Sequence, residues 1–357
     1  MNKHVFIIPE PHIWDKNFKN RVSYPQEIYG YLDRVVSIVK TYEGEDITII
    51  FPGDVFHRTF TSIGGLIKAF NFFATLNNLS NSNVYSCVGN HELSYPFNNP
   101  FWMLAKDKTS RFGSMRGLEA YGSISKGLTV VDDLTIGNLK FIFGHYNRQD
   151  LADESDKDLV LITHNSIIEA EICSYLQNTM GRAANAEYMH TTSLRSKEAL
   201  PLSERLKYVF VGHMHTFYSS FTVEENICGV PMNFQLQYLG SLGRTAVNEV
   251  NDSDLERTIP HFVISEDGTY TYDGISIELQ PRASVVVEEI VTEQHEAYSR
   301  EKAVKQLKES NVFGDSAYDA IVNNLQSFPL NLGLFRELYT NEIDPSIREL
   351  IQEAYTL

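Results

Sequence analysis

Five short polar clusters, each directly after an apolar run with strand character, carry the residues most suited to chemistry. They are Glu10-Pro11-His12, Gly53-Asp54-Val55-Phe56-His57, Gly89-Asn90-His91-Glu92, His164-Asn165 and Gly212-His213-Met214-His215. In α/β sheets the carboxyl ends of the strands open into one crevice, so residues far apart in sequence can converge there. Imidazole and carboxylate ligands together suit Mn, Fe or Zn, whereas an all-oxygen set suits Mg or Ca. The clusters therefore predict a metal site at the end of a sheet.

Each cluster also has an ordinary explanation. A single histidine at a strand end is more often a hydrogen-bonded structural residue than a metal ligand. A lone Gly-Asp is mostly a turn, and Gly-Asn is a common hairpin dipeptide. The prediction therefore depends on finding all five clusters in the same position relative to a strand.

The first half of the chain alternates strand-like and helical patterns. Apolar runs at 4–9, 46–54 and 83–91 predict strands, and residues 28–39 and 63–73 carry apolar side chains at the helical spacing of three and four. This alternation is typical of strands joined by crossover helices. Pro25 suits the start of the first helix. Later segments are expected to form a hairpin at 128–147 with its turn near 136–138, and strands at 159–165 and 207–215.

The pattern changes twice towards the C-terminus. After residue 215 it predicts only strands, at 233–243, 261–265 and 269–279. From 281 onwards Glu and Lys recur at helical spacing. We therefore expect two domains, residues 1–280 and a mostly helical segment at 281–357. The stretch from 168 to 204 is expected to form helix plus loop.

Composition limits the class of protein. The chain has 357 residues, of which 43% are hydrophobic and 21% charged, as in a globular enzyme. It has no apolar run of the ~20 residues that cross a bilayer, and Pro9 and Glu10 come too early for a signal peptide, so a cytoplasmic location without membrane contact is expected. Its three cysteines lie far apart, which favours a reducing compartment.

The net charge of −16 would repel a nucleic-acid backbone at long range. It does not exclude a nuclease, because metal sites concentrate carboxylates and a docking partner can supply a basic surface.

Read in order, the five clusters resemble the motifs of the calcineurin-like metallophosphoesterases, over roughly residues 4–280. The resemblance implies an α/β fold, a four-layer α/β sandwich with a double-ψ β-sandwich core and flanking helices, here followed by a small helical C-terminal region. It also implies two divalent metal ions, for which Mn is expected first and Fe, Zn or Mg are alternatives.

The resemblance further implies a role for each site residue. Asp54 matches the carboxylate that bridges both ions, which lie ~3.5 to 4 Å apart in such sites. His91 matches the residue that stabilises the transition state or protonates the leaving oxygen. The remaining ligands would be Glu10, His12 and His215 for the first ion and Asn90, His164 and His213 for the second.

The second cluster favours one branch of the family. Protein phosphatases carry Asp-Arg-Gly after the Gly-Asp, whereas this chain has Val-Phe-His-Arg. Gly-Asp-Val-Phe-His resembles the branch of the SbcD nucleases of bacteria and phages, in which a histidine here, His57, pairs functionally with His91. The segment Tyr238–Thr245 is similar to the Tyr-x-Gly-Ser segment of SbcD-like proteins. Arg244 within it is a candidate for contact with a substrate phosphate, although Gly-Ser is also ordinary turn chemistry.

These resemblances imply a metal-dependent exonuclease or endonuclease acting on DNA. In that branch the C-terminal segment docks on an SMC-like ATPase of SbcC type, so 281–357 is expected to bind such a partner or to be an ordinary solvated helical segment; a homodimer is a further expectation. The alternatives are a small-molecule phosphodiesterase or phosphatase, and a catalytically silent binding module of the same fold.

One residue departs from the family pattern. Where the family has Asp, position 10 is Glu, which is longer by one methylene. Glu10 either reaches the same metal with a shifted backbone, binds it weakly, or marks a site that has lost catalysis. We favour the first alternative, because all the other ligand positions are filled.

Overall fold

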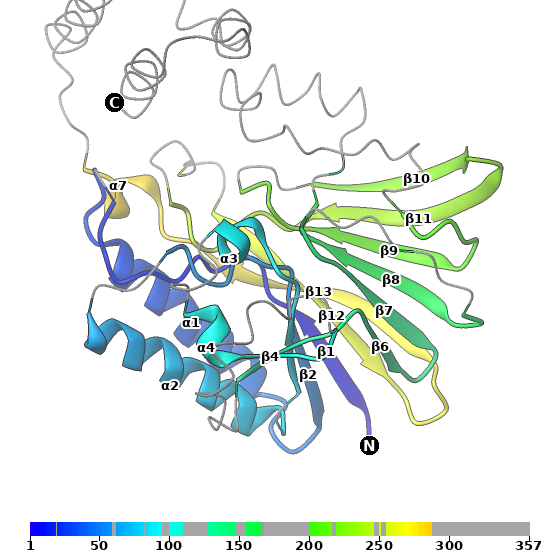
Figure 1. Cartoon of the computed structure of the whole chain (residues 1–357), viewed down its shortest axis with the longest axis horizontal. Coiled ribbons are helices and arrows are strands. Elements are labelled where there is room, and N and C mark those ends of the chain that lie inside the picture. The colour runs from blue at the N-terminus through cyan, green and yellow to red at the C-terminus, as the bar shows by residue number, and fades with distance from the viewer. Residues whose placement is uncertain are drawn as a thin grey trace, which may run out of the picture. The chain divides into compact units, whose positions relative to one another are not determined.

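The computed structural model describes two β-sheets and the helices packed on one of them (Figure 1). The chain divides into two compact units, and all the described residues belong to the unit that comprises Met1–Ile172 and His190–Val287. Among them, no helix is both long and apolar enough to span a membrane. The described residues are 1–18, 20–58, 62–81, 83–94, 100–109, 127–146, 151, 155–165, 167, 200–215, 219–245, 250 and 255–287.

The first sheet has a parallel part and an antiparallel part. Strands β1, β2, β3, β5 and β4 run parallel in that spatial order, while β12 pairs antiparallel with β1, and β13 with β12. The parallel part confirms the crossover connections expected from the first half of the chain. The bounds are β1 Lys3–Ile7, β2 Asp46–Phe51, β3 Val84–Ser86, β4 Ala105–Asp107, β5 Leu128–Val130, β12 Glu256–Ile264 and β13 Tyr270–Glu278.

The second sheet has the order β10-β11-β9-β8-β7-β6. Its four inner strands, β11, β9, β8 and β7, run parallel, and β10 and β6 close its edges as antiparallel hairpin partners. Together the sheets confirm the mixed α/β class. The bounds are β6 Asp133–Ile136, β7 Leu139–Gly144, β8 Asp158–Thr163, β9 Leu206–Val211, β10 Ser219–Ile227 and β11 Val230–Tyr238.

The expected hairpin at 128–147 is shorter than predicted. Leu128–Val130 forms β5 of the first sheet, and the hairpin β6–β7 of the second sheet begins only at Asp133. Its turn includes Gly137, whose φ of 60° suits glycine. The chain therefore crosses between the sheets after Val130. An apolar run looks the same in either sheet, so periodicity could not locate this crossing.

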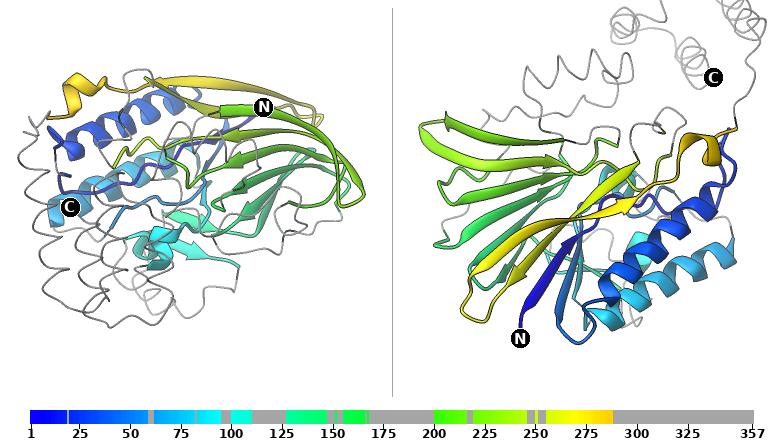
Figure 2. Two further views of the ribbon diagram at one scale, coloured as in Figure 1. Left: turned by 90° about the horizontal axis from the view of Figure 1, so that it is seen from above. Right: turned by 180° about the vertical axis from the view of Figure 1, so that it is seen from behind.

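Helices α1 (Tyr24–Lys40) and α2 (Ile63–Leu79) lie side by side against one face of the first sheet (Figure 2). In α1, Pro25 stands in the first turn as predicted. Strand β1 alternates between two cores, since Phe6 faces the helices while Val5 and Ile7 face the second sheet. Helices and sheets thus form three of the expected layers.

The described residues also form short helices: α3 (Asn90–Ser94), α4 (Phe101–Leu104) and α7 (Arg282–Val285). Phe101 and Trp102 of α4 are buried in the core that also contains α1 and α2. Of the helix and loop expected at 168–204, residues 168–199 lie outside the described residues. The C-terminal segment from 288 lies outside them too. The domain boundary near 281 stays a prediction.

Candidate metal centre

The polar residues that follow β1, β2, β3, β8 and β9 come together at the carboxyl ends of these strands. Because these strands come from two different sheets, the site is built by both. The side chains form three overlapping groups in which the ligand atoms lie within 4.8 Å of one another. The groups are His12, His57 and His91; Glu10, His12, Asp54 and His215; and Asp54, His164 and His213.

The ligands predicted for a first ion lie close together. Glu10 Oε2 is 3.6 Å from His12 Nε2 and 3.7 Å from His215 Nε2, and Asp54 Oδ2 is 3.7 Å from His12 Nε2. These separations are too long for hydrogen bonds, but they suit atoms arranged around one cation, since each metal–ligand bond is ~2.0 to 2.2 Å.

The ligands predicted for a second ion lie close together as well. His164 Nε2 lies 3.3 Å from Asp54 Oδ2 and 2.9 Å from Asn90 Oδ1, and His213 Nδ1 lies 3.0 Å from that amide oxygen. Asp54 Oδ2 therefore belongs to both groups, as a bridging ligand would.

Several polar atoms of the centre are buried with no hydrogen-bond partner among the described residues. They are Glu10 Oε2, Asp54 Oδ2, His57 Nδ1 and both ring nitrogens of His12. Leaving such a group unsatisfied costs about 1–3 kcal/mol. A divalent cation would engage these carboxylate and imidazole atoms together, so the residues present fit a metal centre.

The backbone is unusual at the same place. The backbone φ angles of His12, Asp54 and His213 are 46°, 45° and 67°. They lie in the left-handed region that residues other than glycine rarely adopt. Such conformations cost about 1–3 kcal/mol each and persist where the surroundings require them. All three belong to the predicted ligand set, so the strain coincides with the site.

Two glycines allow the loops to approach these ligands. A Cβ at Gly89 would lie 2.1 Å from Asp54 Oδ1, and a Cβ at Gly212 would lie 2.2 Å from Glu10 Oε1. Neither position can hold a side chain without displacing a carboxylate of the site.

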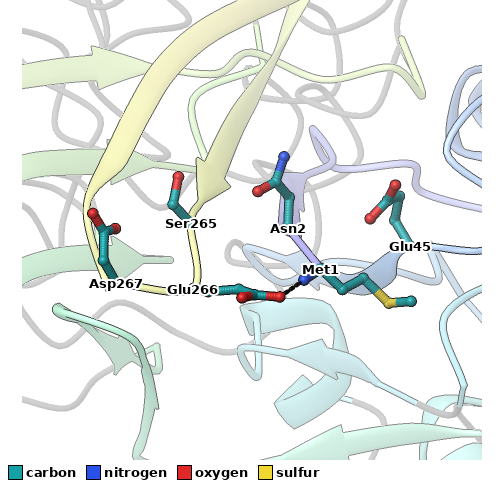
Figure 3. Close-up of a pocket in the computed structure, with 6 residues that line it drawn as sticks. All are labelled: Met1, Asn2, Glu45, Ser265, Glu266 and Asp267. Carbon is teal, nitrogen blue, oxygen red and sulfur yellow. Dashed lines mark hydrogen bonds and ion pairs between the residues drawn. The ribbon is translucent and has the colours of Figure 1, made fainter.

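A hollow of the surface lies away from this centre. The open depression in Figure 3 is lined by Met1, Asn2, Glu45, Ser265, Glu266 and Asp267. It lies at the amino end of β1, whereas Glu10 and His12 follow the carboxyl end of that strand. Three of its side chains are acidic, so it would repel a phosphate.

Comparison with known proteins agrees with this geometry. Residues 5–217, more than half of the chain, match a family model described as Calcineurin-like phosphoesterase. The chain belongs to this family. Calcineurin-like phosphoesterases are metal-dependent phosphoester hydrolases, and the clustered Glu, Asp and His side chains are the chain's candidate sites for divalent metals. A comparison with curated proteins gives no match.

Solved structures similar to this calcineurin-like phosphoesterase are distant. They include a 5'-nucleotidase precursor from Thermus thermophilus (12% identity, TM-score 0.40, covering 80% of this chain and 56% of that one). NAD nucleotidase from Haemophilus influenzae has 10% identity and a TM-score of 0.35 (78% and 56%), and Vps29 from Chaetomium thermophilum has 10% and 0.27 (78% and 98%). The chain thus spans about half the length of both nucleotidases.

Nearby histidines keep two carboxylates of this phosphoesterase, Glu10 and Asp54, ionised for metal binding. Burial would raise the pKa of Glu10 and of Asp54, but His164, 2.8 Å from the first and 3.3 Å from the second, and other nearby histidines outweigh it. The pKa of each carboxyl group therefore lies below its usual value. Both are ionised at neutral pH, as metal ligands must be.

Three histidines of the centre are neutral for a related reason. Burial lowers the pKa of His12 well below its usual value, that of His213 to about 4 and that of His57 to about 3. Neutral imidazoles keep a lone pair for a cation. Burial would also lower the pKa of His164, but the effect of Asp54 and Glu10 is larger and raises this pKa well above its usual value. A metal at Nε2 would therefore displace a proton.

Glu92 is a residue of the centre to which no role was assigned from the sequence. It is fully buried, and its carboxylate accepts hydrogen bonds from the backbone N–H groups of Asp54 and Gly89, both 2.9 Å. Burial and the nearby Asp54 raise the pKa of Glu92 to about 8. It ties the loop after β2 to the loop after β3. Its position beside His91 was the available signal.

His57 and His91 lie beside the first metal group. The ring centroids are 4.7 Å apart, and His91 Nδ1 is 2.6 Å from the backbone carbonyl oxygen of His57. The backbone N–H of His91 donates to Asp54 Oδ1 at 3.0 Å. The pair expected from Gly-Asp-Val-Phe-His and Gly-Asn-His is therefore close in space.

Arg244 is not brought into the cluster. Its side chain is fully buried, and Nη2 donates to Glu27 Oε1, the Tyr31 hydroxyl and the Gln280 carbonyl, each at 2.8 Å. Arg21 forms a second ion pair with Glu27. These contacts account for Arg244 as a residue that holds α1 to the segment after β13, and they give no support to the expected phosphate contact.

Proposed function

We propose that this chain is a two-metal phosphodiester hydrolase whose substrate is DNA. The observation that carries the proposal is the position of His57 and His91 directly beside Asp54, the carboxylate shared by the two groups of ligands. The ligands would be Glu10, His12, Asp54 and His215 for one ion and Asp54, Asn90, His164 and His213 for the other.

The ligand set accounts for the chemistry that the cations would supply. Two divalent ions, of which Mn suits this mixture of nitrogen and oxygen ligands, would polarise the phosphate and lower the pKa of the attacking water. The chain's own contribution is to hold two ionised carboxylates and several neutral imidazoles in fixed positions, with the backbone strain already present.

His91 is proposed as the acid that protonates the leaving oxygen. Its Nδ1 faces the His57 carbonyl, which can only accept, so Nδ1 carries a proton and orients the ring. Its Nε2 faces the centre, 3.8 Å from Asp54 Oδ2. The side chain is 19% exposed whereas that of Asp54 is buried, so a substrate can reach it. A positioned acid of this kind contributes about 10²- to 10⁴-fold.

His57 supports this acid and does not act as one. With a pKa of about 3 its ring is neutral at working pH. The ring packs against Trp14 and Phe18, with centroids at 5.3 and 5.0 Å. His57 therefore serves through its carbonyl oxygen, which fixes the orientation of His91.

DNA is proposed as the substrate because the His57–His91 pair matches the pattern of the SbcD-like branch. The net charge of −16 favours the alternative, a small-molecule phosphodiesterase or phosphatase. A partner, proposed to be an SMC-like ATPase of SbcC type that docks on residues 281–357, would supply the basic surface that DNA binding requires.

The test compares substrates on the manganese-loaded protein. Single- and double-stranded DNA, bis-p-nitrophenyl phosphate and p-nitrophenyl phosphate are each incubated with wild-type protein and with His91→Ala, with and without a chelator. Chelator-sensitive cleavage of DNA that His91→Ala loses supports the proposal. Turnover of a chromogenic substrate without DNA cleavage would favour the small-molecule alternative, and no turnover of any substrate would favour a binding module.

A further inference from the structure

Glu10 contacts both groups of ligands, although it was expected to serve only the first. Its Oε2 lies in the first group, 3.6 Å from His12 Nε2 and 3.7 Å from His215 Nε2. Its Oε1 points to the second group instead, 2.8 Å from His164 Nδ1, and it also accepts the backbone N–H of His213. The two oxygens of this carboxylate therefore lie in different sites.

We propose that Glu10 serves both metal sites, with Oε2 as a ligand of the first ion and Oε1 as the hydrogen-bond acceptor that positions His164 for the second. The inference rests on the proposed two-metal centre. It also accounts for Glu at position 10, where the family has the shorter Asp, because one residue then links the two sites directly.

The contacts of His164 define which of its nitrogens carries the proton. Nδ1 faces two acceptors, Glu10 Oε1 at 2.8 Å and the Pro52 carbonyl at 3.1 Å, so it is the nitrogen that keeps its proton when a metal binds at Nε2. Nε2 faces Asp54 Oδ2 at 3.3 Å and Asn90 Oδ1 at 2.9 Å. Nε2 directed at these two oxygens needs a proton or a cation between them, and a metal ion bound there would take the place of the proton. Glu10 thus holds the ring in the tautomer that a metal at Nε2 requires.

The chain is built to seat this carboxylate. The backbone carbonyl of Glu10 accepts from Ser241 Oγ and Leu242 N, both at 2.9 Å, which fixes the base of the side chain. At its tip, Gly212 leaves room that a Cβ, 2.2 Å from Oε1, would fill. A side chain shorter by one C–C bond would withdraw the carboxylate by ~1.5 Å and break the contact with His164 Nδ1.

Manganese binding tests the link without any enzymatic readout. Free Mn²⁺ is measured by electron paramagnetic resonance during titration of wild-type protein, His12→Ala, Glu10→Gln and Glu10→Ala. Wild-type protein should bind two ions. His12→Ala and Glu10→Gln should each lose the first ion and bind the second with one common Kd, because the glutamine oxygen can still accept from His164 Nδ1. Glu10→Ala should lose the first ion and bind the second about 10- to 100-fold more weakly.

Two further measurements keep the test decisive. Circular dichroism melting checks that each variant is folded. Gly212→Ala, which displaces the Glu10 carboxylate while all the ligand residues are still present, should weaken binding of the second ion in the same way as Glu10→Ala. Equal second-ion Kd values for Glu10→Ala and Glu10→Gln would overturn the inference alone. Failure of the wild-type protein to bind manganese would overturn both it and the two-metal proposal.

Discussion

Two regions of this molecule bring histidines and carboxylates together, and they do so in opposite ways. At the metal centre, ring nitrogens and carboxylate oxygens are buried without hydrogen-bond partners in the described part of the chain. In the strands β1, β12 and β13, His4 Nδ1 lies 3.0 Å from His261 Nε2, and His261 Nδ1 lies 3.0 Å from Asp273 Oδ1. That second group, the His4–His261–Asp273 chain, satisfies its own polar atoms.

The backbone differs between the two regions as well. His12, Asp54 and His213 occupy the left-handed region, whereas His4, His261 and Asp273 lie within paired strands. The rings of His4 and His261 stack at 5.2 Å, and His261 also stacks on Phe6. A histidine cluster therefore indicates a ligand site when strain and unsatisfied atoms accompany it, and a structural role when neither does.

The largest expected effect comes from the carboxylate that the two metal groups share. Asp54→Asn keeps the size of the side chain and removes its charge, so we expect loss of both manganese ions and a fall in kcat/KM of at least roughly a thousandfold, about 4 kcal/mol. Metal analysis and hydrolysis of a chromogenic phosphodiester measure this. Asp273→Asn is the matched control and should retain two ions and full activity. An Asp54→Asn protein with normal metal content would remove the distinction between the regions.

A smaller loss is expected from His91→Ala, which should lower kcat on DNA by about 10²- to 10⁴-fold and leave manganese content unchanged. The loss should nearly vanish with bis-p-nitrophenyl phosphate, because its leaving group departs without a proton. Equal losses on both substrates would mean that His91 does not act as an acid. His261→Gln, in the other region, should change neither rate.

Metal binding should also stabilise the fold through the centre alone. Manganese at 100 times its Kd should raise the free energy of unfolding by about 2.7 kcal/mol for one site. Urea unfolding with and without the ion measures this in wild-type protein, Asp54→Asn and Asp273→Asn. The increase should appear in wild-type and Asp273→Asn and be absent from Asp54→Asn. A rise of similar size in Asp54→Asn would place the stabilising ion elsewhere.

Much of the centre could be predicted because its residues follow strands. Parallel strands bring their carboxyl ends to one edge, so the run of apolar residues before Asp54, His164 or His213 was enough to predict convergence. Apolar periodicity predicted many of the strands and the helix α1, whereas the two-sheet core was implied only by the resemblance to the family. This reasoning gave no role to Glu92, because its side chain accepts hydrogen bonds from backbone N–H groups of loops whose path the sequence does not define.

Other features could not be read from residue types. Arg244 was expected to meet a phosphate, but whether a guanidinium faces a substrate or a buried Glu27 depends on packing across residues 217 apart in the chain. The contact of Glu10 Oε1 with His164 depends likewise on the space left by Gly212. Tyr146, whose ring lies 5.9 Å from His164 and 5.5 Å from His213, gave no signal at all.

The smallest effect concerns the pH dependence of stability in the His4–His261–Asp273 chain. Burial lowers the pKa of His4 and of His261 below that of an unfolded histidine, so the unfolded state binds more protons. Their contribution to stability is therefore present above the unfolded pKa of ~6.5 and is lost as the pH falls from there towards the folded values. Urea unfolding of wild-type protein and His4→Phe/His261→Gln at pH 7.5 and 5.5 measures it. The double variant should lose less stability on acidification, because the site histidines titrate equally in both proteins and cancel. If the double variant lost as much stability as the wild type, His4 and His261 would titrate like exposed histidines. The two regions would then differ only in backbone strain and in unsatisfied polar atoms.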